Sequence, residues 1–335
     1  MIITLLAKLG VMGLYSMVSA LWAYYVVKNK AEPGWQRSLA ALPFLALNLA
    51  MPLALDYTTE PTLITPVAGC FSLAAFKLAA LCIGRGPLAH PWGLRDFVAV
   101  MVMPIIPAVM FTVSGGSQLH RAPRTGLTLW RSYGIDVTVA LLVSWLLLIP
   151  SLPIAIRHWL YTLGSATFLG AVFDAMGELT RLATGILAAP AFDKPWLCDS
   201  FSDFWARRWN LVTTYMMRVL VYDPIMEGRI ATFLVSGLWH ILIFLYNTHT
   251  FSWRWCLFFS IQAPILLVER TILKAATKAH LLPPHPLRVV AANSLLILIA
   301  TPLFFGPADT HGFASRNLEV GQQLWTSYVR PLLRL

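Results

Sequence analysis

The feature that most constrains this chain is a series of long apolar runs, spread over most of its 335 residues. A helix needs about 20 mostly apolar residues to cross the hydrocarbon core of a bilayer, and these runs have that length. Only 12% of the residues are charged, about half the share of a soluble domain. The runs do not alternate every second residue, as the strands of a membrane barrel would. Because lipid cannot satisfy a backbone, we expect an all-α fold, a polytopic transmembrane helical bundle.

We predict eight spans, with uncertain edges, at 2–27, 38–55, 61–83, 135–156, 159–190, 230–249, 252–270 and 287–305. The segment 96–113 is a ninth candidate, but Pro104 and Pro107 break a helix interior. Basic loops favour the cytosolic side, and a full span at 96–113 would place the arginines of 115–134 in the lumen. We therefore favour a re-entrant or interfacial segment there. No repeat or linker divides the chain, so residues 1–335 form one predicted domain.

The net charge of +10 is best explained by basic loops that set topology and contact anionic lipid headgroups. Nucleic acid is therefore not an expected partner, whereas the lipid bilayer is. The four cysteines show no CxxC spacing, so neither a disulfide framework nor a metal site is indicated, and no cofactor is expected.

One charged segment, SFSDFWARRWN, interrupts the apolar sequence and begins at Ser200. Ser200 followed by Asp203 is typical of a helix start, and Asp203 would then pair with Arg207 four residues on. The same spacing would place Trp205 and Trp209 on one face, with Arg207, Arg208 and Asn210 near the indoles. Arginine binds phosphate and indole stacks on bases, so this surface would suit coenzyme A. An ordinary interfacial helix is the alternative.

Two further features follow within thirty residues. VYDP, with Tyr222 and Asp223, predicts a turn because the residue before a proline disfavours helix. His240 lies near the middle of the apolar run ATFLVSGLWHILIFLY. An ionisable group at that depth is a functional candidate by default, and a neutral imidazole can accept a proton from an alcohol. Ser236 shares its face and Gly237 allows close helix approach, while a structural hydrogen-bonded histidine is the alternative.

Other ionisable residues in apolar segments favour structural roles. Asp174, Glu178 and Arg181 lie on one predicted helix at spacings that suit a self-neutralised cluster rather than catalysis. Lys77 lies close to the end of its span, where a lysine is expected to extend toward the interface.

The segments SFSDFWARRWN, VYDP and ATFLVSGLWH together resemble the plant wax synthases. These are long-chain-alcohol O-fatty-acyltransferases of the membrane-bound O-acyltransferase superfamily. The segment FKLAALCIGRGPL gives weaker support to the resemblance, which covers nearly the whole chain and is strongest within 191–249. Other catalytic signatures, including the G-x-S-x-G elbow, Walker A and H-E-x-x-H motifs, are absent from the sequence.

The resemblance implies a helical membrane enzyme of the endoplasmic reticulum that uses a fatty acyl-CoA donor and a lipophilic alcohol acceptor. It assigns His240 as the general base and Asn210 as its partner, and it makes the charged segment the element that engages acyl-CoA. Many family members carry an acidic residue directly after the histidine, whereas this chain has Ile241. A sterol or diacylglycerol acceptor is the nearest alternative. A lipid transporter or a non-catalytic acyl-CoA-binding protein is an alternative of another class.

Overall fold

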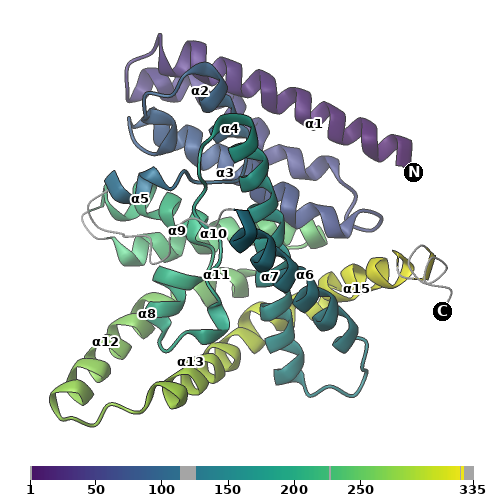
Figure 1. Cartoon of the computed structure of the whole chain (residues 1–335), viewed down its shortest axis with the longest axis vertical. Coiled ribbons are helices and arrows are strands. Elements are labelled where there is room, and N and C mark those ends of the chain that lie inside the picture. The colour runs from purple at the N-terminus through teal and green to yellow at the C-terminus, as the bar shows by residue number, and fades with distance from the viewer. Residues whose placement is uncertain (1, 114–125, 226–227, 325, 328–335) are drawn as a thin grey trace.

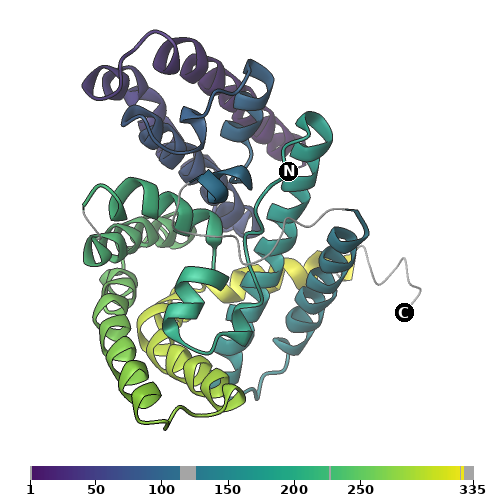
Figure 2. The ribbon, with the colours of Figure 1, turned by 60° about the vertical axis from the view of Figure 1, so that its left-hand side comes forward.

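The computed structural model describes residues 2–113, 126–225, 228–324, 326 and 327. In these residues the chain is helical, and a single isolated bridge between Pro107 and Ala188 is the only extended pairing. Helices α1 to α4 gather at one end of the molecule, and α12 and α13 lie at the other (Figures 1 and 2). Figure 1 places α10 and α11 between these two groups. The predicted all-α bundle is confirmed.

Six helical segments of the described residues are long and apolar enough to cross a membrane, against the eight or nine spans predicted. The first three are Thr4–Lys28, Trp35–Ala54 and Pro61–Cys82, and the last three are Arg229–Thr248, Trp253–Lys278 and His285–Thr310. Leu14 and Leu298 are each 68% exposed on these segments, as expected of side chains that face lipid.

The helices that build these spans, in chain order, are α1 (Ile2–Trp22), α2 (Trp35–Ala50), α3 (Pro61–Cys82), α10 (Arg229–Thr248), α11 (Trp253–Ser260), α12 (Gln262–Lys278), α13 (His285–Ala300) and α14 (Gly306–Thr310). Two spans include a π-helical turn, at Ala23–Lys28 after α1 and at Thr301–Phe305 between α13 and α14. The remaining helices are α4 (Leu94–Val102), α5 (Val109–Val113), α6 (Gly126–Leu146), α7 (Ile154–Thr184), α8 (Phe201–Asp203), α9 (Leu211–Met217) and α15 (Phe313–Leu324).

Two of the predicted spans do not meet the length and hydropathy of a crossing helix. The range 135–156 joins two elements, because α6 ends at Leu146 and α7 begins at Ile154. Pro150 and Pro153 lie between them and break the helix. The range 159–190 also extends too far, because α7 ends at Thr184 and is followed by Gly185, which has a left-handed φ of 81°.

The segment 96–113 is not one continuous helix. Helix α4 ends at Val102, an extended stretch follows, and α5 begins at Val109. The extended stretch is buried and pairs with 187–189, where the Ala108 amide donates to the Leu187 carbonyl and the Ala189 amide donates to that of Ile106. Irregular backbone at membrane depth is tolerated where protein encloses it, so a broken, enclosed segment replaces a simple span.

Lys77 of α3 stabilises this break. Its ammonium group donates to the carbonyl oxygens of Val100, at 2.7 Å, and Met103, at 2.6 Å. The helical partners of these two carbonyls would be the amides of Pro104 and Pro107, and proline has none. Lys77 is fully buried, so the expectation that it reaches toward the interface is wrong. Two carbonyls that lack amide donors hold the ammonium group inside the protein instead.

Candidate functional site around His240 and the charged segment

His240 is held in a defined tautomer by its own helix. Its Nδ1 lies 2.7 Å from the carbonyl oxygen of Ser236, one turn earlier on α10. A carbonyl oxygen can only accept, so Nδ1 carries the proton and donates it. In the neutral ring Nε2 is then unprotonated and free to accept a proton, which is the state that a general base requires. Ser236 therefore contributes its backbone carbonyl to the site.

Aromatic side chains from three elements surround the imidazole. Phe259 of α11 stacks on it at 3.8 Å between ring centroids, with an interplanar angle of 25°. Trp255 lies at 6.3 Å, Phe304 at 6.4 Å and Trp239 at 4.7 Å. The imidazole is half-buried among these rings, and such an apolar surrounding suits an apolar substrate. Of these residues only Trp239 adjoins His240 in the sequence, and no local pattern singles out Trp255, Phe259 or Phe304, because aromatic residues are common throughout the chain.

Gly237 makes the approach of α11 possible. A Cβ atom at this position would lie 2.9 Å from the carbonyl oxygen of Cys256 and 3.0 Å from its Cα atom, closer than real Cβ contacts allow. The prediction that Gly237 permits close helix packing is confirmed. The contact brings α11, and with it Phe259, against the face of α10 that carries His240.

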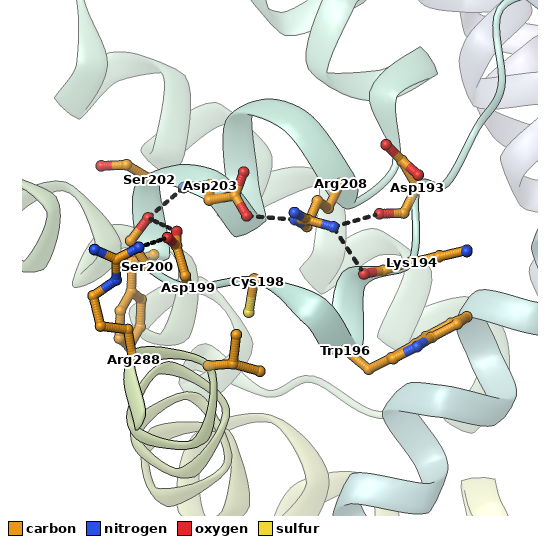
Figure 3. A network of polar contacts seen from close by, with 12 residues as sticks. Asp193, Lys194, Trp196, Cys198, Asp199, Ser200, Ser202, Asp203, Arg208 and Arg288 are labelled. Carbon is orange, nitrogen blue, oxygen red and sulfur yellow. Dashed lines mark hydrogen bonds and ion pairs between the residues drawn. The ribbon is translucent and has the colours of Figure 1, made fainter. Parts of the chain in front are cut away.

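The charged segment begins with the predicted helix cap. The hydroxyl of Ser200 accepts a hydrogen bond from the Asp203 amide at 3.1 Å. The carboxylate of Glu269, on α12, accepts from the amides of Phe201 and Ser202 at 2.6 and 2.9 Å. On the other side, Arg288 of α13 pairs with Asp199 at 2.6 Å (Figure 3). Side chains of α12 and α13 thus fix the start of the segment.

The predicted pair between Asp203 and Arg207 is wrong, because the segment is not α-helical. Residues Phe204–Arg208 form a π-helix. In a π-helix, residues five positions apart share a face, whereas in an α-helix residues four positions apart do. Arg208 therefore forms the ion pair with Asp203. It also donates to the carbonyl oxygens of Asp193 and Lys194, each at 3.3 Å (Figure 3).

Arg207 has a different environment from Arg208. It is exposed, and it forms no ion pair within the described part of the chain. Of the two arginines assigned to acyl-CoA, Arg207 is therefore available to a ligand, whereas Arg208 is bound to protein groups.

Trp205 and Trp209 do not share a helical face, because the π-helix ends at Arg208 and Trp209 is extended. The Trp209 ring stacks on Phe204 at 5.2 Å and lies against Phe192. Trp205 instead donates its indole N–H to Gln262 at 3.1 Å and contacts Phe259 at 5.7 Å. Phe259 is the ring that stacks on His240, so a single side chain connects the charged segment to the histidine.

Asn210 caps helix α9. Its backbone is left-handed, with φ 41°, a conformation that asparagine tolerates better than most residues. Its side-chain oxygen accepts from the Thr213 amide at 3.2 Å. Within the described residues no hydrogen bond joins Asn210 to His240. The side-chain oxygen therefore has a structural role, and the catalytic role of Asn210 stays a prediction that depends on its side-chain amide group.

The remaining predicted positions lie as follows. Another π-helix, Arg218–Tyr222, ends directly before Asp223, and the turn predicted at VYDP is present. Asp223 is exposed and pairs with Arg218 at 3.4 Å, again five residues apart, while Tyr222 is half-buried. On α7, Arg181 makes two hydrogen bonds of 2.7 Å to Glu178, as the structural interpretation predicted.

Comparison with known proteins indicates the same class of enzyme, an acyltransferase, as the sequence motifs do. No family model matches the chain. The "Probable long-chain-alcohol O-fatty-acyltransferase 8" of Arabidopsis thaliana is 29% identical over 319 residues, which cover 90% of each chain. The chain is a homologue of the plant wax synthases. The "Long-chain-alcohol O-fatty-acyltransferase" of Simmondsia chinensis is 26% identical over 284 residues, 78% of each chain. The predicted enzyme class, a membrane acyltransferase, is thereby confirmed.

A sterol-specific name also occurs among these relatives. The "Acyl-CoA--sterol O-acyltransferase 1" of Arabidopsis thaliana is 30% identical over 219 residues, which cover 60% of this chain and 63% of that protein. The acceptor alcohol thus differs between proteins that match this chain at similar identity.

Proposed function

We propose that this protein transfers a fatty acyl group from acyl-CoA to a long-chain fatty alcohol and forms a wax ester. The observation that carries the proposal is the tautomer of His240. Its Nδ1 proton is donated to Ser236, which leaves Nε2 as an acceptor inside an aromatic surrounding. The names of the relatives in Arabidopsis thaliana and Simmondsia chinensis supply the substrate class.

In the proposed reaction, Nε2 of His240 takes the proton from the alcohol hydroxyl as its oxygen attacks the thioester carbonyl. The carbon–sulfur bond then breaks, coenzyme A leaves as a thiolate, and the imidazolium returns the proton to the sulfur. A positioned base contributes about 10²–10⁴-fold to such a step. Ile241 follows His240, so an adjacent carboxylate is not available to orient the ring, and the Ser236 carbonyl takes that role.

Two groups of the charged segment complete the proposed site. Arg207, which is exposed and unpaired among the described residues, would contact the phosphates of coenzyme A. The side-chain amide of Asn210 would donate to the thioester oxygen as negative charge develops. We place the enzyme in the endoplasmic reticulum membrane, with the charged segment on the cytosolic face where acyl-CoA is available.

The test is transfer of labelled acyl groups from acyl-CoA by microsomes that contain the protein. Fatty alcohols, sterols and diacylglycerol serve as competing acceptors. We expect ester formation with fatty alcohols, and loss of about 10²–10⁴-fold in turnover for His240→Ala. A preference for sterols would keep the proposed acyl transfer but change the acceptor alcohol, in line with the sterol acyltransferase among the relatives.

His311 supplies a matched control, since its Nδ1 also lies 2.8 Å from a carbonyl oxygen four residues earlier, that of Pro307. His311→Ala should keep most of the turnover. If His240→Ala kept more than about half of it as well, the base assignment would be wrong.

A further inference from the structure

A second histidine, His158 on α7, is bonded at both ring nitrogens. It is fully buried. Its Nδ1 lies 2.9 Å from the hydroxyl oxygen of Thr301, and its Nε2 lies 2.9 Å from a carboxylate oxygen of Asp309. Thr301 and Asp309, which follow His158 by more than 140 residues, therefore hold its ring from both sides.

The direction of these two hydrogen bonds follows from the partners. An ionised carboxylate only accepts, so Nε2 carries a proton and donates it to Asp309. In the neutral ring Nδ1 then accepts, and the Thr301 hydroxyl donates to it. Every polar atom of the imidazole is thereby used, and the ring orientation is fixed at both ends.

The two partners bracket an irregular turn. Thr301 is the first residue of the π-helix Thr301–Phe305, and Asp309 lies on α14, directly beyond it. Pro302 lacks the amide that would continue α13, and a Cβ atom on Gly306 would lie 3.0 Å from the Thr301 carbonyl oxygen. Single π-turns inside helices occur often at functional sites.

This turn places consecutive aromatic side chains against the two histidines. Phe305 packs on His158 at 5.0 Å between ring centroids. Phe304 stacks on Trp255 at 4.1 Å, and its carbonyl oxygen accepts from the Trp255 indole at 2.8 Å. Phe304 and Trp255 both belong to the aromatic surrounding of His240.

We propose that His158 is a positioning residue for His240. By holding Thr301 and Asp309 together, it fixes the π-turn, and the fixed turn keeps Phe304 and Trp255 beside the His240 ring. The effect on turnover rests on the proposed acyltransferase function, whereas the effect on the surroundings of His240 does not. Loss of the two hydrogen bonds would loosen one side of the aromatic surrounding and increase the access of water to the half-buried His240 ring.

The experiment compares His158→Phe with His158→Gln in the full-length, detergent-solubilised protein. Phenylalanine keeps a ring against Phe305 but makes neither hydrogen bond. Glutamine can accept from Thr301 through its oxygen and donate to Asp309 through its nitrogen. Two quantities are measured: the rate at which diethyl pyrocarbonate modifies His240, by peptide mass spectrometry, and the kcat and KM of acyl transfer.

We expect His158→Phe to speed modification of His240 several-fold relative to that of His249 in the same sample, and to lower kcat by up to about 10²-fold with little change in KM. His158→Gln should restore both values toward the wild type. If His158→Phe cannot be recovered folded, Thr301→Val removes one of the two hydrogen bonds and takes its place.

An unchanged modification rate of His240 in these variants would overturn the positioning role, even if turnover fell. In that case the Thr301–His158–Asp309 cluster would act by another route. If the wild type shows no acyl transfer at all, the proposed function fails, and the modification rates alone decide this inference.

Discussion

Arg208 forms an ion pair with Asp203, five residues earlier, across the single π-turn Phe204–Arg208. The same side chain donates to the carbonyl oxygens of Asp193 and Lys194, and Lys194 has a left-handed φ of 46°. The pair therefore joins the charged segment to the chain that leads into it. Its neighbour Arg207 is left exposed, and this difference separates a structural arginine from the arginine that we propose binds the donor.

Arg208→Gln and Asp203→Asn should lower the stability of the folded protein by about 1.5–3 kcal/mol, the value of a charge-assisted hydrogen bond, measured as a lower Tm. The control is Arg218→Gln, whose partner Asp223 is 39% exposed, so less than about 1 kcal/mol is expected. Equal losses in Arg208→Gln and Arg218→Gln would show that the less exposed pair, Arg208 with Asp203, has no special role.

Arg207→Gln should leave Tm unchanged and raise the KM for acyl-CoA by roughly 10- to 150-fold, because one charge-assisted hydrogen bond to phosphate is lost. The effect should shrink at high salt, since the group is exposed. Lys274→Gln removes an exposed charge elsewhere and should leave this KM as it is. An unaltered KM in Arg207→Gln removes the phosphate-binding role.

Asn210→Asp tests the two roles of this side chain separately. Aspartate tolerates the left-handed backbone and can still accept from the Thr213 amide, so the Tm should equal that of the wild type. The amide donor is lost, and kcat should fall by about 10²–10³-fold if it stabilises the oxyanion. Steady-state kinetics normalised to folded protein measures this, and a wild-type kcat would limit Asn210 to its capping role.

Lys77→Met should destabilise the protein, because the Val100 and Met103 carbonyls lose their ammonium donor inside the protein. Each unsatisfied buried group costs about 1–3 kcal/mol. Pro104→Ala in the Lys77→Met background restores an amide that can donate to the Val100 carbonyl if α4 extends past Val102, and it should recover part of the loss. Thermal unfolding of the single and double variants measures the coupling, and strictly additive effects would contradict the role given to Lys77.

Ala206→Cys tests the side of the membrane on which the charged segment lies, since Ala206 is exposed beside Arg207. Burial raises the pKa of the Cys198 thiol to about 12, so that native cysteine stays protonated near neutral pH and should contribute little labelling. An impermeant maleimide should label Ala206→Cys in sealed microsomes. Labelling that requires opened membranes would place the segment in the lumen and exclude the donor site there.

The sequence by itself determined the membrane class, six of the spans, the cap at Ser200, the turn at VYDP and the close approach at Gly237. Each of these depends on local composition or on residues within one turn of each other, so periodicity and spacing are sufficient. The motif residues also determined the resemblance that the relatives confirm.

Only the tertiary structure decided which arginine pairs with Asp203, because an extra residue in a π-turn shifts every later side chain to another face. The tertiary structure also decided where the Lys77 side chain lies. A lysine near the end of a span normally extends to water, but here carbonyl groups of another segment, which lack amide donors, accept hydrogen bonds from its ammonium group. The aromatic surroundings of His240 and the bonds of His158 join segments far apart in sequence, and no local pattern specifies such pairings.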